Sequence, residues 1–399
     1  MEKALSRIQH FMKLEASAGL VLMGIAVLAM IAANTGLATL YNAFLSTYVK
    51  VGVGSFEIAK PALLWINDGL MAIFFFLVGL EIKREVLAGE LSSLDKALLP
   101  ILAAIGGMAI PALIFVYFNW GDPEVLAGWA VPTATDIAFA LGILALLGSR
   151  VPVALKVFLL AIAIIDDLGA IVIIAIFYTS ELSTNALALT IVSFALAVAL
   201  NRMGVRSMTP YLIIGIFMWV CVLKSGVHAT IAGVMIALTI PLNAKDGEQA
   251  LLLRVEHALH PWVAFLILPI FAFANAGVSL QGISLTDLAD PLPLGIAVGL
   301  FAGKQIGVFG ATWLGCKLGV ARLPKGVTWV HIYGVACLTG VGFTMSLFIG
   351  SLAFASPETM NTVRLGVISG SILAGLLGYT VLRMNSTRGL EPNQTTLRQ

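Results

Sequence analysis

The chain of 399 residues is 59% hydrophobic and 11% charged, and its formal net charge is +2. A soluble domain has about 25% charged residues, so this chain lacks the polar surface that a water-soluble fold needs, and we expect a membrane protein. Its basic residues are scattered and form no stripe, which excludes a nucleic-acid partner. Cys221, Cys316 and Cys337 lie in or beside apolar segments without the spacing of a metal site, and their odd number argues against a disulfide framework.

Apolar runs of membrane-spanning length, or close to it, recur along the chain. They predict an all-α integral membrane protein with twelve transmembrane helices in a single transmembrane domain, residues 1–399. The first run follows three basic residues, as in a signal peptide, but it is too long for one. The runs cover residues 15–35, 59–80, 97–118, 125–147, 151–177, 186–200, 209–223, 226–242, 259–278, 292–316, 327–352 and 363–382.

The Lys and Arg residues of the loops set the orientation. With the N-terminus inside, most of them fall on the cytoplasmic side, and few, such as Lys50 and Lys224, fall outside. A missed helix would reverse the sides of every later loop, so this bias also supports the count. Both termini are therefore expected in the cytoplasm.

The loop between the first two spans, residues 44–60, has partly alternating apolar residues around Gly52 and Gly54. This pattern suggests a short periplasmic hairpin. A lone hairpin is marginally stable and exposes its strand edges, so pairing with its copy in a homodimer is one interpretation. The other is a polar loop that lies on the membrane.

Two of the predicted spans contain helix breakers at mid-membrane. In the fourth span, Pro132 removes a backbone donor and is followed by the polar run 133–136. The eleventh contains Gly340 and Gly342 among hydroxyl residues. Free backbone groups at this depth are tolerated only inside protein or against a water-filled cavity. The fourth and eleventh helices are therefore predicted to be broken and to share a hydrated site.

The positions of the breaks indicate an inverted repeat. The third to fifth spans, residues 97–177, begin on the cytoplasmic side, whereas the tenth to twelfth, residues 292–382, begin on the outer side. In each triplet the middle helix is the interrupted one. Inverted-topology repeats of this kind place the ion site near the membrane midplane.

Asp166 and Asp167 are adjacent in the middle of the apolar run 151–177. A charge at the centre of a membrane helix costs about 2.5 to 3.5 kcal/mol on insertion scales, and ionisable residues so placed are functional by default. Neighbours on a helix point about 100° apart, so the two carboxylates can serve different partners. A solvated pair at a helix end is the alternative, but the long apolar flanks argue against it.

Lys304 is a further charge in mid-membrane, with apolar sequence on both sides. A buried Lys needs a carboxylate partner or must lose its proton, so we expect it to pair with an acid of the fifth helix. Gly299, Gly303 and Gly307 recur at a spacing of four and predict a stripe along which another helix approaches closely.

Five segments carry a resemblance to a known family. They read NDGLMAIFFFLVGLEIKRE (67–85), ATDIAFALG around Asp136, AIAIIDDLGA around the Asp pair, FANAGVSLQG (273–282) and LTGVGFTMSLFI (338–349). Together they resemble the bacterial NhaA Na+/H+ antiporters of enterobacterial type, over nearly the whole chain. That family is itself an established example of inverted repeats, so the repeat is no independent prediction. Gln305 departs from the pattern, because Pro is expected after the buried Lys.

The resemblance implies an electrogenic, pH-regulated exchanger of Na+ or Li+ for H+ in the bacterial inner membrane. It implies that Asp167 binds the cation, that Asp166 is the second essential carboxylate and pairs with Lys304, and that Asp136 and Thr135 lie where the broken helices cross. The expected partners are Na+, Li+, H+, membrane lipid and a second copy of the chain. No cofactor other than the transported ion, and no enzyme activity, is expected.

A second cluster resembles the pH-sensing region of the same family. It comprises Glu81, Lys83, Arg84 and Glu85 at the inner end of the second span, with Glu256, His257 and His260 before the ninth. Histidine titrates near neutral pH, although charged residues at inner helix ends are also normal for any membrane protein. His228 is expected to be a core residue with its hydrogen bonds satisfied.

Two other functions compete with exchange. An intramembrane aspartyl protease also uses two Asp residues, but they must face each other across a water, whereas sequence neighbours diverge around one helix. A passive Na+ channel would conduct without coupling to protons. The sequence leaves ion selectivity, transport rate, the pH set point and the resting state open.

Overall fold

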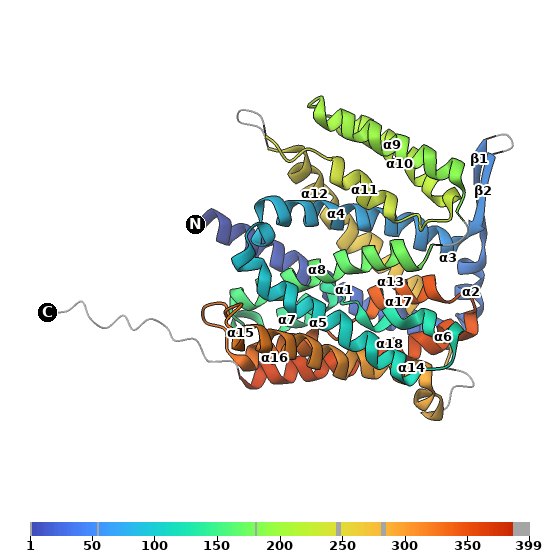
Figure 1. Cartoon of the computed structure of the whole chain (residues 1–399). Helices are drawn as coiled ribbons and strands as arrows, with labels where there is room; N and C mark the ends of the chain where they lie inside the picture. The colour runs from blue at the N-terminus through green and yellow to red at the C-terminus, as the bar shows by residue number, and fades with distance from the viewer. Residues whose placement is uncertain (1, 54–55, 180–181, 245–248, 281–284, 386–399) are drawn as a thin grey trace.

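The computed structural model describes residues 2–53, 56–179, 182–244, 249–280 and 285–385. Its long helices lie side by side, and α1 begins at the same end of the bundle at which α18 ends (Figure 1). The α-helices are α1 (Glu2–Asn34), α2 (Ala38–Ser46), α3 (Ala62–Trp65), α4 (Met71–Ala88), α5 (Leu94–Phe118), α6 (Pro123–Leu126), α7 (Ile137–Leu146), α8 (Val153–Phe177), α9 (Thr184–Arg202), α10 (Met208–Ser225), α11 (Ile231–Thr239), α12 (Leu251–Trp262), α13 (Leu268–Ala276), α14 (Pro291–Val298), α15 (Gly310–Lys317), α16 (Trp329–Leu338), α17 (Phe343–Ala353) and α18 (Pro357–Met384).

Short segments of other helix types connect or interrupt these helices. The 3₁₀-helices are η2 (Glu90–Ser92), η3 (Ala127–Thr133), η4 (Gly148–Arg150) and η6 (Leu285–Ala289). The π-helical segments are η1 (Ile66–Leu70), η5 (Val263–Ile267), η7 (Gly299–Gly303) and η8 (Gln305–Phe309). Several long spans therefore change their winding at mid-length.

Nine helical stretches of the described residues are long and apolar enough to cross a membrane, and there are eleven if each of two bent pairs counts as one span. The chain is therefore a multi-span helical membrane protein, as its composition predicts. The eighth predicted run, residues 226–242, forms only α11, nine residues long. The count of twelve stays a prediction.

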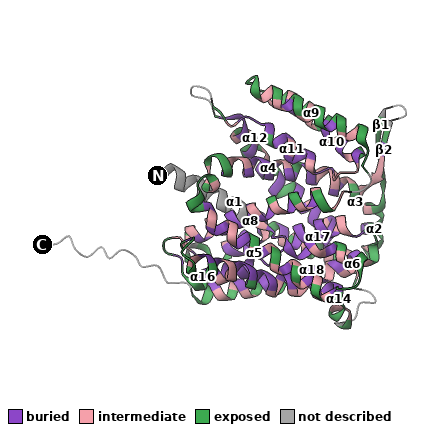
Figure 2. Ribbon diagram, viewed as in Figure 1, coloured by how far each residue is buried: buried purple, intermediate pink, exposed green. Residues whose placement is uncertain are grey.

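The outer surface of the bundle is apolar. Figure 2 shows the buried residues in the interior and the exposed residues around the outside. Leu113, Ile191 and Ile213 are 63%, 59% and 64% exposed. Exposed apolar side chains on this scale would be a liability in water, whereas in a bilayer they meet lipid.

The segment between α2 and α3 contains the only strands of the described residues. Strands β1 (Tyr48–Val53) and β2 (Phe56–Pro61) pair antiparallel, with Val51 opposite Ile58. Residues 54–55, at the turn, lie outside the described residues. Lys60 of β2 forms an ion pair of 2.7 Å with Asp68 of η1, which fixes the hairpin to the bundle. A dimer contact through the hairpin stays a prediction.

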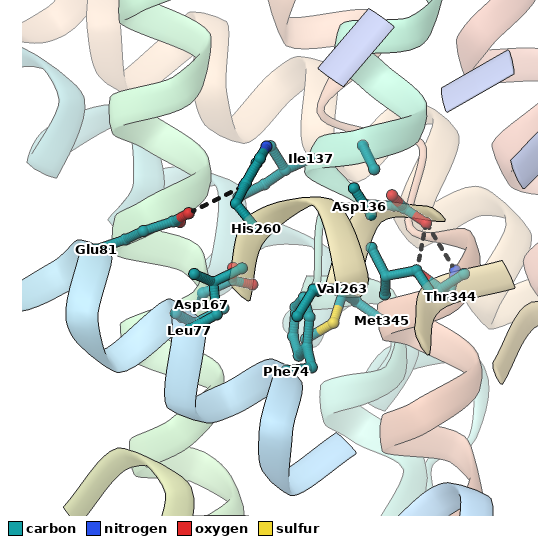
Figure 3. A pocket seen from close by; sticks show the side chains of 14 residues that line it. Phe74, Leu77, Glu81, Asp136, Ile137, Asp167, His260, Val263, Thr344 and Met345 are labelled. Atoms are coloured by element: carbon teal, nitrogen blue, oxygen red, sulfur yellow. Dashed lines mark hydrogen bonds and ion pairs between the residues drawn. The ribbon is translucent and has the colours of Figure 1, made fainter. Parts of the chain in front are cut away.

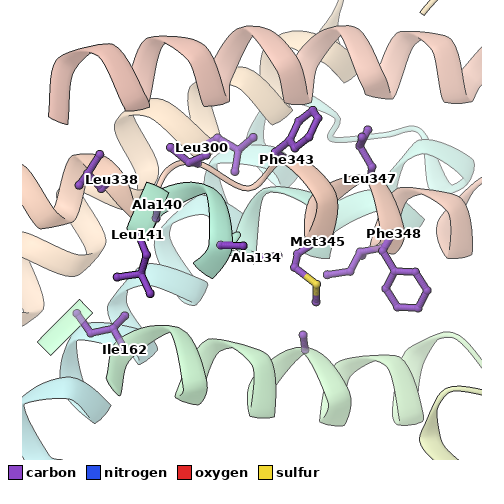
Figure 4. Packing of buried hydrophobic residues seen from close by; sticks show 14 of the residues in the cluster. Ala134, Ala140, Leu141, Ile162, Leu300, Leu338, Phe343, Met345, Leu347 and Phe348 are labelled. Carbon is purple, nitrogen blue, oxygen red and sulfur yellow. The ribbon is translucent and has the colours of Figure 1, made fainter. Parts of the chain in front are cut away.

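The core lies where the bent helices cross. Leu300, Leu338 and Leu347 are fully buried, and Figure 4 shows Met345 and Phe348 pointing from α17 toward α8. Around this core, helices approach closely at the predicted glycine stripe. A Cβ atom on Gly307 would lie 2.1 Å from the Gly106 carbonyl oxygen of α5, and the backbones are therefore in direct contact.

We predict that Gly307→Ala destabilises the protein. The added Cβ meets main-chain atoms that cannot rotate away, and overpacking of this kind costs about 1 to 3 kcal/mol. The measurement is the melting temperature of the purified protein in detergent. Gly310→Ala is the matched control on the same span, because no atom lies within 4 Å of a Cβ there. Equal melting temperatures for the two variants would contradict the backbone contact.

Candidate ion-binding site

The two bent helix pairs meet at their breaks. The segment Pro123–Thr133 and α7 are bent by 41°, and α16 and α17 by 43°. The Asp136 amide at one break donates a hydrogen bond of 2.7 Å to the Val341 carbonyl at the other. A Cβ atom on Gly340 would lie 2.3 Å from the Leu300 carbonyl oxygen, so only glycine fits where this segment passes the Lys304 helix.

Asp136 caps the N-termini of both following half-helices. Its Oδ1 accepts a hydrogen bond of 2.9 Å from the Phe139 amide of α7. Its Oδ2 accepts a hydrogen bond of 3.0 Å from the Thr344 amide of α17 and a second hydrogen bond from the Thr344 hydroxyl (Figure 3). The unsatisfied amides of a helix N-terminus carry partial positive charge. This carboxylate therefore compensates two such ends at once.

Lys304, Asp166 and Thr135 form a second, fully buried group. The Lys304 ammonium donates to Asp166 Oδ2 at 2.7 Å and to Thr135 Oγ1 at 2.9 Å, and the Lys304 side chain is 0% exposed. The Thr135 hydroxyl lies 2.7 Å from Asp166 Oδ2 and 2.9 Å from the Thr339 carbonyl oxygen just beyond α16. The structure thus pairs Lys304 with the fifth-span acid for which it is expected.

Asp167 points elsewhere. Within the described residues its carboxylate has no hydrogen-bond or ion-pair partner, although it is only 2% exposed. It lines a cavity of about 50 Å³, which has room for a small ion with one or two waters. Asp166 instead faces Lys304, so the neighbouring carboxylates serve different partners, as helix geometry predicts.

The cavity lies among several elements. It is lined by Phe74, Leu77 and Glu81 of α4, by Val263 of η5, by Asp167 of α8, and by Asp136 and Thr344 at the helix crossing (Figure 3). Among the described residues, no three His, Cys, Asp or Glu side chains converge to hold a metal ion. A hard monovalent cation at Asp167 would therefore complete its shell with hydroxyl, carbonyl or water oxygens.

Most of the expected pH-sensing residues gather between α4 and α12. Arg84 Nε lies 2.9 and 3.0 Å from the carboxylate oxygens of Glu256, and Arg84 also bonds Glu85. His260 Nδ1 is 3.9 Å from Glu81 Oε1, and both residues line the cavity (Figure 3). His257 lies apart, because it is exposed and its ring bonds the Leu253 carbonyl of its own helix.

Lys83 and His228 have ordinary partners. Lys83 donates to the Leu238 and Ile240 carbonyls at 2.7 and 2.6 Å. His228 Nδ1 lies 2.8 Å from the Thr230 hydroxyl and its Nε2 lies 3.6 Å from Asp68. His228 is therefore a largely buried residue with satisfied contacts, as expected.

Hydroxyl groups hold the crossing together, and sequence reasoning missed the one that comes from α18. Ser371 of α18 accepts hydrogen bonds of 3.2 Å from the amides of Gly342 and Phe343, at the start of α17. Ser346 donates a hydrogen bond of 2.7 Å to the Val131 carbonyl of η3. A hydroxyl in an apolar span is a weak signal, since most such groups bond their own helix. Only the three-dimensional crossing singles out Ser371.

Two discontinuous helices that cross beside buried carboxylates and a buried Lys define a class, the secondary ion transporters. Residues 9–382 match the family model described as Na+/H+ antiporter 1. The chain is 59% identical over 390 residues to the Na(+)/H(+) antiporter NhaA of Rhodospirillum rubrum, covering 96% of this chain and 98% of that protein. It is 58% identical over 378 residues to the Na(+)/H(+) antiporter NhaA of Pseudomonas fluorescens, covering 94% and 96%. The chain therefore belongs to the Na+/H+ antiporter 1 family.

We predict that Lys304→Ala lowers thermal stability, because it leaves the Asp166 carboxylate buried without its cation. Removing one partner of a buried pair costs about 3 to 5 kcal/mol, less where water enters. The melting temperature of purified protein is the measurement. Adding Asp166→Asn should recover part of the loss, and Lys156→Ala on α8 is the control at a partly exposed Lys. A wild-type melting profile for Lys304→Ala would show that the pair contributes nothing.

Proposed function

We propose that this protein exchanges Na+ or Li+ for H+ across the bacterial inner membrane, with cation and protons competing for Asp166 and Asp167. The observation that supports this most is the position of Asp167. Its carboxylate faces a small cavity without a partner among the described residues, while its neighbour Asp166 is held by Lys304 and Thr135. Relatives over nearly the full length are named Na(+)/H(+) antiporters, which supports the same function.

Competition follows from the chemistry of two adjacent carboxylates. A monovalent cation binds hard oxygen donors only when they are ionised, and two like charges so close favour uptake of a proton or of a cation. The pair then titrates as a unit. Cation binding releases protons on one side of the membrane, and reprotonation on the other side expels the cation.

The crossed helices provide the alternating access that such an exchange needs. The first inverted repeat, residues 97–177, supplies η3, α7 and α8, and the second, residues 292–382, supplies the Lys304 span, α16, α17 and α18. Sites between inverted repeats open to one side at a time. If both carboxylates must be deprotonated, more than one proton moves per cation, and the cycle is electrogenic. The membrane potential then drives Na+ out of the cell.

The position of the charged cluster supports pH regulation. Glu81 and His260 line the cavity itself, and Arg84, Glu85 and Glu256 adjoin them. A change of protonation there alters the field at the cavity mouth. We further propose that this mouth, and both chain termini, face the cytoplasm, that β1 and β2 contact a second copy, and that lipid surrounds the bundle. Residues 386–399 of the C-terminus lie outside the described residues.

An intramembrane aspartyl protease fits this geometry less well. Its two carboxylates must share a water, whereas Asp166 is bonded to Lys304 and Asp167 faces away from it. Incubation of purified protein with transmembrane peptides separates the two functions, because specific cleavage would favour the protease.

We predict that Asp167→Asn and Asp166→Asn each abolish Na+/H+ exchange while the protein stays folded and inserted, because each removes a titrating oxygen without adding volume. Exchange is measured in everted vesicles as Na+-induced collapse of the pH gradient. Asp122→Asn is the control, since this exposed acid caps α6 and Asn caps equally well. Substantial exchange by Asp167→Asn would show that the ion site is elsewhere.

We predict that the apparent affinity for Na+ weakens steeply as the pH falls, because protons occupy the same oxygens. The affinity should level off only where the carboxylates are fully ionised. Isotopic Na+ binding to purified protein, measured from acid to mildly alkaline pH together with proton release on adding Na+, tests this. A pH-independent affinity, or Na+ binding that releases no protons, would favour the channel.

A further inference from the structure

The helix that carries Lys304 is π-helical on both sides of that residue. Between α14 and α15 it consists of the π-helical segments η7 and η8, with Lys304 between them. A π-helical turn is rare and often marks a functional position, because it widens the helix and redirects carbonyl groups. The direction of the Lys304 side chain therefore depends on what fixes this segment.

On one side the segment is fixed by backbone contact with α5. A Cβ atom on Gly303 would lie 2.9 Å from the Pro111 Cα, and one on Gly307 would lie 2.1 Å from the Gly106 carbonyl oxygen. Gly107 leaves room for the Lys304 side chain, whose Nζ lies 3.7 Å from the position of a Cβ there. These contacts with α5 fix the distance between the two helices. Among the described residues of this contact, no side chain donates or accepts a hydrogen bond across it.

On the other side the segment is tied to α16 by Gln305. The side chain of Gln305 donates a hydrogen bond of 2.6 Å to the Phe301 carbonyl of the preceding turn. Its Oε1 accepts a hydrogen bond of 2.8 Å from the Tyr333 hydroxyl of α16. Gln305 is 9% exposed, and a buried amide is favourable only when it is hydrogen-bonded. This amide stands where the family pattern led us to expect Pro, which could make neither bond.

The Gln305–Tyr333 link closes a ring that includes the site. Lys304 contacts Thr135, Thr135 contacts the Thr339 carbonyl beyond the end of α16, and Tyr333 of the same helix returns to Gln305, the neighbour of Lys304. Phe309 packs edge-on against Tyr333 with ring centroids 5.7 Å apart, which holds the phenol in place. Thr135, which receives the Lys304 ammonium, and Gln305, which adjoins Lys304, are thus both bonded to α16 or to its end.

We infer that Gln305 is a positioning residue for cation exchange. Its hydrogen bond to Tyr333 fixes the position of the Lys304 segment along α16. The Lys304 ammonium is thereby placed within bonding distance of both Asp166 and Thr135. The arrangement of these oxygens determines how well Asp166 and Asp167 receive a cation. The inference rests on the proposed function and adds a residue that touches neither the ion nor the carboxylates.

The test uses Gln305→Met, Tyr333→Phe and the double variant in everted vesicles, with the apparent KM for Na+ and the maximal rate measured separately. Each single variant should raise the apparent KM by roughly three- to tenfold, the effect expected from loss of one hydrogen bond. The maximal rate should stay within about twofold, because the carboxylates are untouched. The double variant should be no worse than the stronger single one, because both changes remove the same bond.

Thr312→Val is the matched control. Thr312 is fully buried on the same span, and its hydroxyl donates 2.6 Å to the Val308 carbonyl of its own helix. The control loses a buried hydrogen bond of similar kind, but one that does not link the Lys304 segment to α16. The apparent KM for Na+ should therefore stay unchanged even if the melting temperature falls. Tyr333→Phe keeps the ring packing and is the variant least disturbing to the fold.

Unchanged apparent KM in both single variants would overturn the inference, as would fully additive effects in the double variant. A fall in melting temperature and in maximal rate without a change in KM would also overturn it, because the link would then be only structural. Failure of the proposed function gives a different result, since the wild-type protein itself would then show no Na+-dependent collapse of the pH gradient.

Discussion

The structure depends on how charge is compensated far from water. A single charge at mid-membrane costs about 2.5 to 3.5 kcal/mol, so the buried groups occur in balanced sets. Asp136 neutralises the amide ends of α7 and α17, and Lys304 is balanced by Asp166. The breaks at the crossing create these free helix ends, and the Asp136 carboxylate compensates them. Asp167 is buried at the cavity, and its carboxylate has no hydrogen-bond or ion-pair partner among the described residues.

Much of this could be predicted from sequence, because charges and helix breakers in an apolar chain have few interpretations. A buried Lys304 needed a partner of opposite charge, and the residues alone predicted an acid of the fifth helix; the resemblance implied that this acid is Asp166. Pro132 and Gly340 lie at or beside the two bends, because a missing donor and an absent side chain are local properties that weaken a helix where they occur. The glycine stripe predicted a close helix contact for the same reason.

Other features depended on distances that no local pattern encodes. Ser371 caps α17 from another helix, and nothing near it in the sequence distinguishes it from a hydroxyl that bonds its own turn. His257 and His260 lie three residues apart, yet His257 is exposed and His260 lines the cavity. Which face of a helix is buried depends on the elements that pack against it, and the local sequence does not specify them. The eighth run formed the shorter helix α11, since its ends near Gly226 and Ile240 adopt irregular backbone.

The contact between Gly106 and Gly307 has a mechanical consequence. Packed side chains allow neighbouring helices to slide a little past one another, as in shear motions, but main-chain atoms in direct contact do not. The α5 helix and the Lys304 segment are therefore a rigid block. The cavity, by contrast, is lined by side chains from α4, η5, α7, α8, α12, α13 and α17. Side-chain contacts of this kind can slide, so relative movement of helices is easier at the cavity, where Asp167 lies, than along the α5 contact.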